Sequence, residues 1–163
     1  MNQCGIIWGT CKKDQKMNAK SIIIRLLVIY GVAMGINFVW EMAQMPLYQE
    51  MPFDEIRSYF LCMRASFGDA NITISIFVLG LLLFRDWNWP AKLTIPKLAY
   101  LIISGGGIAI LIELSALKGD RWAYASVMPL LPVVKIGLIP LLQLIVLPLS
   151  SYYLSLKISL SRE

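Results

Sequence analysis

The sequence predicts an all-α integral membrane protein, a compact bundle of four transmembrane helices with both termini in the cytoplasm. Its composition supports this class, because 58% of the 163 residues are apolar and 15% are charged, against roughly 45–50% and about 25% in an ordinary soluble domain. Four apolar segments also reach about 20 residues, the length that crosses a hydrocarbon core of roughly 30 Å. Soluble-enzyme classes are therefore excluded.

The chain begins with a polar, basic segment, residues 1–20, which shows no apolar periodicity. We expect a disordered cytoplasmic tail, and Met17 offers an alternative translation start just before the first apolar run. That run continues from Ser21 to Trp40 and then meets Glu41. It is too long for the apolar region of a cleaved signal peptide and lacks a small-residue cleavage site. The segment is therefore expected to be an uncleaved first span.

The four spans are expected at about 21–45, 65–84, 98–117 and 133–156, with 157–163 as a cytoplasmic tail. Within the first outer loop, 46–64, apolar residues recur at helical spacing beside charged ones. This pattern predicts a short amphipathic helix on the membrane surface. The apolar residues are Phe53, Ile56, Tyr59, Phe60 and Met63. No internal repeat or separate soluble domain is visible.

Two further features concern the third and fourth spans. The triple glycine 105–107 offers close backbone approach to a neighbouring helix or to a ligand. Pro140 and Pro148 are expected to kink the fourth span and to free carbonyl groups that Gln143 or water would satisfy. A kinked helix of this kind suits either a polar cavity or plain packing irregularity, and the sequence leaves both open.

The orientation follows from the distribution of lysine and arginine. Ten of the fifteen basic residues fall on the side of the two termini and the 85–97 loop, and five fall on the other side. Both termini are therefore expected to face the cytoplasm. Trp87 and Trp89 would then lie at the inner interface, and Trp40 and Trp122 at the outer one, as an aromatic belt requires. The basic residues form no block typical of nucleic-acid binding.

The chain contains no histidine. Histidine is the commonest proton-transfer side chain near neutral pH and the commonest transition-metal ligand. Zinc proteases, histidine-ligated haem and Ser–His triads are therefore excluded as expectations. Cys4, Cys11 and Cys62 fit neither a redox nor a zinc spacing. No metal and no cofactor are expected.

Polar residues inside spans are expensive and mark candidate sites. With a helical rise of about 1.5 Å per residue, the four most polar positions all fall in the outer third of their spans. They are Glu41, Asp69, Glu113 and Gln143. For Glu113 and Asp69 three readings stay open: a structural carboxyl group, a ligand-binding group and a proton-transfer group.

Helical spacing adds neighbours to these positions. Asn37, Glu41 and Gln44 share one face of the first span. Ser66, Asp69 and Thr73 share a face of the second, within the small polar stretch that also contains Asn71. In the third span Gly106, Ala109 and Glu113 share a face. All three faces are expected to turn inward.

The third loop places two cations and an acid just outside the level of Glu113. Arg121 is expected to pair with Glu41, Asp69 or Glu113, or to bind an anionic headgroup or phosphate through its planar fork of donors. Trp122 and Tyr124 follow it in the chain and are further candidate ligand-binding residues.

Short segments of the chain resemble known families, but these resemblances do not assign an activity to it. The segments 67–71 and 119–121 resemble the aspartate motifs of signal peptidase II, but in reversed order along the chain. The segment 118–122 is similar to a run in sterol-isomerase-like four-span proteins, which use histidine. The overall pattern of Trp40-Glu41, Gly68-Asp69 and 121–124 looks like small bacterial membrane proteins. This likeness implies a multi-pass protein of the bacterial inner membrane.

Two functional hypotheses follow. In the first, an acidic pocket near the outer leaflet binds or converts a lipid or isoprenoid-like molecule. Glu113, Asp69 and Glu41 would be catalytic, and the ligand would bind Arg121, Trp122, Tyr124, Gln143, Asn37, Gln44 and Asn71. In the second, the protein is a non-enzymatic subunit of a membrane complex or a small oligomeric transporter. Its polar cluster would be structural or would conduct ions or protons. The partners expected are the lipid bilayer and further copies or subunits.

Overall fold

The protein folds into four long helices, seen in a computed structural model that describes residues 19–49 and 51–160. The helices are α1 (Ala19–Gln44), α2 (Ile56–Phe84), α3 (Ile95–Lys118) and α4 (Leu138–Leu160). Two short 3-10 turns lie between them, η1 (Met45–Leu47) and η2 (Trp89–Ala91). All four helices are long and apolar enough to cross a membrane by length and composition. The prediction of an all-helical fold with four apolar helices is confirmed for the described residues, which contain isolated β-bridges and no strands.

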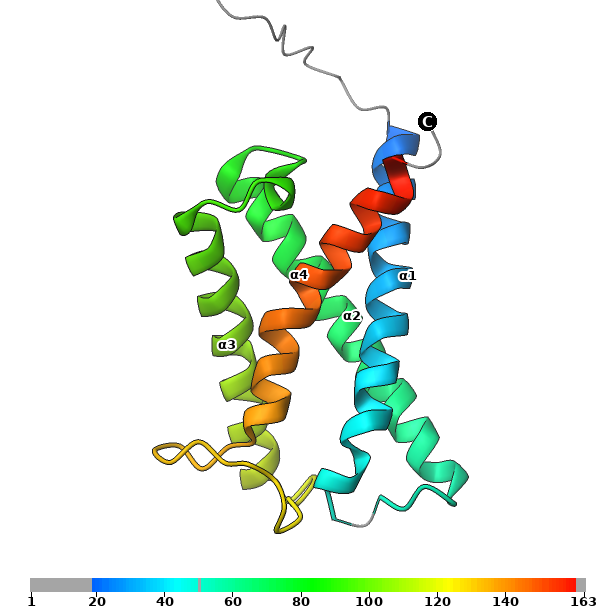
Figure 1. The fold of residues 1–163 in the computed structure, drawn as a ribbon, viewed down its shortest axis with the longest axis vertical. Coiled ribbons are helices and arrows are strands. Elements are labelled where there is room, and N and C mark those ends of the chain that lie inside the picture. The colour runs from blue at the N-terminus through cyan, green and yellow to red at the C-terminus, as the bar shows by residue number, and fades with distance from the viewer. Residues whose placement is uncertain (1–18, 50, 161–163) are drawn as a thin grey trace, which may run out of the picture.

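The helices run alternately up and down, so that each end of the bundle collects particular loops (Figure 1). The start of α1, the end of α4 and the 85–94 loop lie at one end, which we call the terminal end. The 45–55 and 119–137 loops lie at the other, which we call the loop end. Helix α4 crosses between the others and packs against α1, α3 and, less extensively, α2. Residues on α4 can therefore reach side chains from every other helix.

The helix bounds differ most from the expected spans at the starts of α2 and α4. The segment expected to form a separate surface helix is instead the first part of α2, which runs without a break from Ile56 to Phe84. Neither proline nor glycine interrupts 56–67, so nothing there ends the helix. At the fourth span, α4 begins at Leu138 rather than Val133, because 125–137 fold back as a loop closed by the Leu130–Gly137 bridge. The expected N-terminal tail lies outside the described residues apart from 19–20, which belong to α1.

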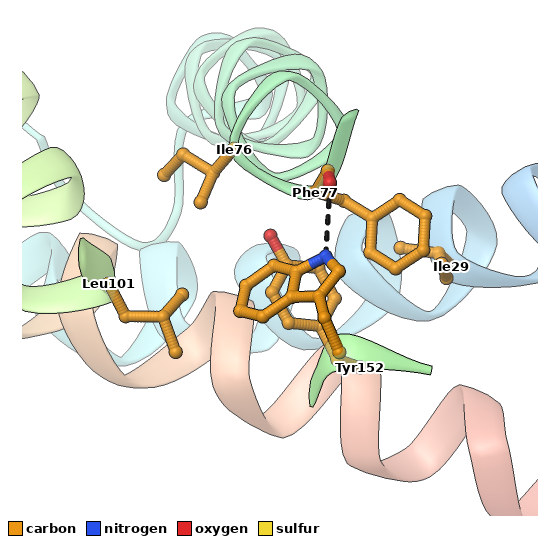
Figure 2. Close-up of a cluster of buried hydrophobic side chains, with 6 residues drawn as sticks. Ile29, Ile76, Phe77, Leu101 and Tyr152 are labelled. Carbon is orange, nitrogen blue, oxygen red and sulfur yellow. Dashed lines mark hydrogen bonds between the residues drawn. The ribbon is translucent and has the colours of Figure 1, made fainter. Parts of the chain in front are cut away.

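Trp89, expected at the inner interface, is fully buried among other side chains at the terminal end. Its indole Nε1 donates to the carbonyl of Phe77 at 3.2 Å. Figure 2 shows the buried cluster that surrounds the indole, formed by Ile29, Ile76, Phe77, Leu101 and Tyr152. Gly80 makes this insertion possible, because a Cβ there would lie 2.6 Å from the indole ring. The 85–94 loop thus closes the terminal end with a packed aromatic core.

Helix α3 approaches α4 closely through its glycines. A Cβ at Gly105 would lie 2.1 Å from the carbonyl oxygen of Leu144. Leu144 is four residues before Pro148, and proline has no N–H to donate to that carbonyl. The carbonyl that Pro148 leaves without its helical partner therefore faces the Gly105 backbone, whereas Gln143 or water was expected to satisfy it.

Candidate functional site

Gln143 on α4 is the centre of a buried polar cluster and is 2% exposed. Its amide Nε2 lies 2.8 Å from Glu41 Oε1, 2.8 Å from Asp69 Oδ2 and 3.1 Å from Asn37 Oδ1. Its Oε1 accepts a hydrogen bond from Gln44 Nε2 at 3.0 Å. One side chain of α4 therefore joins α1 and α2 at a single level of the bundle.

The cluster holds more acceptors than its central donor can serve. An amide NH₂ group has two hydrogens, whereas three oxygen atoms surround Nε2 of Gln143. The amide group of Asn37 itself donates to the Ala33 carbonyl of its own helix at 2.8 Å. Glu41 and Asp69 are close neighbours, because an oxygen of each lies 2.8 Å from the same Gln143 nitrogen. No lysine or arginine among the described residues forms an ion pair with either carboxyl group.

The α2 side of the cluster carries a buried polar face, as the spacing predicts. Cys62, Ser66 and Thr73 are almost completely buried, and Asp69 lies between them in the helix. The Ser66 hydroxyl donates to the carbonyl of Cys62 at 2.7 Å. Asn71 does not belong to this face, because it is exposed and its amide bonds the Phe67 carbonyl of its own helix at 2.8 Å.

Glu113 forms a second group, separate from the Gln143 cluster. It is 4% exposed, and its Oε2 accepts hydrogen bonds from Trp122 Nε1 at 3.3 Å and from the hydroxyl of Tyr124. The Tyr124 oxygen in turn accepts from the Gly137 backbone N–H at 2.9 Å. Glu113 thus fixes the 119–137 loop to α3. Glu113 makes no hydrogen bond to Glu41, Asp69 or Gln143 within the described residues, so the single acidic pocket stays a prediction.

The 45–55 loop joins the same assembly from the other side. Tyr48 and Tyr124 form an isolated antiparallel bridge, with backbone hydrogen bonds of 2.9 Å from Gln49 to Ala123 and from Ala125 to Leu47. The Tyr48 ring lies 6.3 Å from that of Trp122 and 5.8 Å from that of Tyr124, between centroids. The 45–55 and 119–137 loops therefore form a paired strap across the loop end of the bundle.

Arg121 makes none of the three expected ion pairs. Its Nη2 donates to the Ser115 hydroxyl at 3.1 Å, and the guanidinium lies 5.3 Å from the Trp122 ring centroid. Trp122 and Tyr124 donate hydrogen bonds to Glu113, one of the three carboxyl groups with which Arg121 was expected to pair. Arg121 is exposed at the loop end, so its headgroup-binding role stays a prediction.

Burial raises the pKa of Tyr124 above the ordinary tyrosine value, and its hydrogen bond to Glu113 raises it further. A raised pKa means that Tyr124 stays protonated to a higher pH in the folded state than in the unfolded chain. The associated stability is therefore fully present below the unfolded tyrosine value of about 10 and is lost as the pH rises through the folded value. Tyr124 accordingly remains a proton donor to Glu113 throughout the neutral range.

Replacing Tyr124 with phenylalanine is expected to lower the free energy of unfolding by about 1–3 kcal/mol, because Glu113 loses a donor and the Gly137 N–H loses its acceptor. The loss of stability above about pH 10 should also become shallower. Denaturation of the detergent-solubilised protein at neutral and alkaline pH measures both effects. Tyr59→Phe is the matched control, because its hydroxyl bonds only the Phe53 carbonyl in the exposed 45–55 loop region. An equal effect of both variants would contradict the role of Tyr124.

Three residues of this region were missed as site residues by sequence reasoning. The sequence does not identify Tyr48 as a site residue, because it lies in a loop, where no helical periodicity predicts which way a side chain faces. Thr73 was visible only as a member of the α2 polar face. Tyr152, whose hydroxyl donates to the Thr73 carbonyl at 2.7 Å, lies in an apolar run where tyrosine is ordinary core.

Two apolar hollows lie on the bundle, and neither is lined by a carboxyl group. The larger, about 470 Å³, lies between the 85–94 loop and α4, and the smaller, about 210 Å³, between α1 and α2. No group of three acidic or cysteine side chains suited to a metal ion occurs within 19–49 and 51–160. No protein-family model, curated protein or solved structure significantly matches the chain.

Proposed function

We propose that this protein is a multi-pass membrane protein whose Glu41–Asp69 pair binds and exchanges a proton inside the bundle. It would act as a small transporter, alone or as an oligomer, or as a proton-handling subunit of a membrane complex. One observation carries the proposal: three acceptor oxygens surround the two N–H hydrogens of Gln143. This favours the second of the two sequence-based hypotheses over carboxylate catalysis on a lipid.

The proton follows from the chemistry of the groups present. Ionised carboxyl groups only accept hydrogen bonds, and the Gln143 amide can donate to two of the three oxygen atoms around it, so a proton on Glu41 or Asp69 would supply the missing donor. No arginine or lysine of the described residues balances their charge by an ion pair. Two adjacent carboxyl groups that cannot both ionise share one proton. Gln143 then supports the shared proton by donating to both partners.

The membrane setting is supported by the four apolar helices. The excess of lysine and arginine on the terminal side supports a cytoplasmic location for both termini. The carboxyl pair would then lie nearer the outer side. Reporter fusions that are active only in the cytoplasm should be active at the C-terminus and inactive when inserted into the 45–55 loop.

A second candidate function is binding of a lipid or isoprenoid-like molecule. The observation that favours it is the apolar hollow of about 470 Å³, which Leu149, Ser150 and Tyr153 line on α4. A chain bound there would lie away from Glu41 and Asp69, so the site would bind rather than convert it. Lipidomics of the purified protein tests this candidate, since a specific lipid should co-purify and should be lost in Ser150→Trp.

Infrared spectroscopy of the protein in lipid vesicles tests the proton site. At about pH 7, where exposed carboxyl groups are ionised, we expect a protonated carboxyl band. Glu41→Gln or Asp69→Asn should remove or displace this band. Glu55→Gln should leave it unchanged, because Glu55 is exposed at the start of α2. A wild-type spectrum without the band, or a band insensitive to both substitutions, would rule out the shared proton.

A further inference from the structure

The larger apolar hollow of the bundle has two walls, from segments far apart in the chain. Its volume of about 470 Å³ lies within the roughly 300–1,000 Å³ of small-molecule sites in proteins. The Ser150 hydroxyl on one wall donates to the Val146 carbonyl of its own helix at 3.1 Å, so its hydrogen is used within α4. A hydrocarbon chain suits such a lining. The lining residues are Pro90, Ala91 and Leu93 of the 85–94 loop and Leu149, Ser150 and Tyr153 of α4.

The buried aromatic core holds both walls of this hollow in place. Trp89, which precedes Pro90 in η2, is 0% exposed, and its ring centroid lies 5.6 Å from that of Tyr152. On the other wall Leu149 packs against the same buried cluster. Closing the hollow would pull Pro90 or Leu149 away from this core, whereas a lipid chain can fill it without disturbing the packing.

A lysine lies at one edge of the hollow. Lys157 follows Tyr153 by four residues in α4, and its Nζ lies 5.0 Å from the centroid of the Tyr153 ring, within the range of a cation–π contact. Tyr153 lines the hollow, and α4 runs from there to the terminal end (Figure 1). A positive charge is therefore held where the hollow meets the terminal end.

The other charges of the terminal end have mostly the same sign. Among the described residues this end carries one acidic side chain, Asp86, whose Oδ2 lies 3.6 Å from Lys97 Nζ. Lys92 lies in the chain between the lining residues Ala91 and Leu93. Lysine and arginine at a membrane surface attract acidic lipids, so this end favours an anionic ligand over a neutral one. The basic residues there are Lys20, Arg25, Arg85, Lys92, Lys97 and Lys157.

From this combination we infer that the hollow binds an acidic phospholipid of the surrounding membrane. One acyl chain lies between the 85–94 loop and α4, and the phosphate of the headgroup lies at Lys157. The inference names the lipid class for the second candidate function proposed above and rests on it. The lipid joins the loop that carries Trp89 to α4, so it binds the folded bundle and stabilises it.

Native mass spectrometry of the detergent-solubilised full chain tests the inference. The protein is titrated with dioleoyl phosphatidylglycerol, which is anionic, or with dioleoyl phosphatidylcholine, which has the same chains and no net charge. The dissociation constant of the first bound lipid should be about fivefold lower for phosphatidylglycerol, as expected for one basic residue near a membrane surface. Lys157→Gln should remove this preference and leave the binding of phosphatidylcholine unchanged.

Lys118→Gln is the matched control, because Lys118 is also exposed in the last turn of a helix but lies at the loop end. This variant should keep the preference for phosphatidylglycerol. Ser150→Trp and Ala91→Trp fill the hollow from opposite walls and should each weaken the binding of both lipids. Two variants are used because a bulky residue on one wall alone could act by disturbing the fold.

The possible failures separate the lipid class from the lipid site. If the wild type binds both lipids equally, or if Lys157→Gln keeps the preference, the acidic class is overturned. In that case the loss of both lipids in Ser150→Trp and Ala91→Trp still supports the lipid site. If neither of these variants weakens binding, the second candidate function is overturned as well. The Glu41–Asp69 proton site is tested independently by its infrared band.

Discussion

Gly105→Ala is expected to lower the free energy of unfolding by about 3 kcal/mol, the upper part of the usual range for overpacking. The added Cβ would lie 2.1 Å from the Leu144 carbonyl oxygen and 3.0 Å from its carbonyl carbon. Backbone atoms cannot rotate away as a side chain can. Relief therefore requires α3 and α4 to separate, which also weakens the contacts that position Gln143 and Glu113.

Gly107→Ala is the matched control, because Gly107 lies in the same helix and a Cβ there would meet no atom within 4 Å. Alanine is a better helix former than glycine by up to about 1 kcal/mol, so this variant should be as stable as the wild type or more so. Reversible unfolding in mixed detergent micelles measures both. If Gly105→Ala proved as stable as Gly107→Ala, the close contact between α3 and α4 would be wrong.

Gln143→Leu is expected to cost about 3 kcal/mol, because four side chains lose their shared partner at once. Individual polar contacts in membrane helices are worth less than this, roughly 0.6 kcal/mol on average. The larger figure reflects two carboxyl groups left adjacent without a donor. Thermal unfolding of the detergent-solubilised protein measures the loss, and the carboxyl band should change as well.

Asn71→Leu provides the comparison for that variant, since it also removes an amide from a helix of the bundle. Asn71 is exposed and bonds only its own helix, so its replacement should leave the stability unchanged within about 0.5 kcal/mol.

A second comparison is Gln143→Leu combined with Asp69→Asn, which returns an amide donor beside Glu41. This double variant should recover part of the lost stability. If Gln143 did not stabilise the protein through its bonds to Glu41 and Asp69, the double variant would be no more stable than Gln143→Leu alone.

The composition and the period of the apolar residues predicted the four helices, because each span must hide its own backbone and must reach a fixed length. The same period placed Asn37, Glu41 and Gln44 on one face and Asp69 and Thr73 on another. It also placed Gly106 and Glu113 on the buried face of α3, where the structure has them. These features depend only on positions within one helix.

Features that depend on two segments could not be predicted in this way. Equal depths suggested one acidic pocket, but depth does not fix which groups bond, and in the structure Glu113 bonds the 119–137 loop whereas Glu41 and Asp69 bond Gln143. Arg121 has the length to reach several carboxyl groups, and packing on Trp122 decides where it goes. The tryptophan belt rule gave no sign that Trp89 is buried inside the bundle, where a glycine nine residues earlier leaves room for the ring.

The sequence by itself determined that this chain forms four apolar helices with a few polar side chains on their inner faces. The tertiary structure decided which of these side chains meet. It brought Glu41 and Asp69 together on Gln143 of the crossing helix α4, and it placed the carbonyl opposite Pro148 against Gly105. The physical reason is that helical period is a property of one backbone, whereas pairing across helices depends on crossing geometry and on which side chains can pack without a gap.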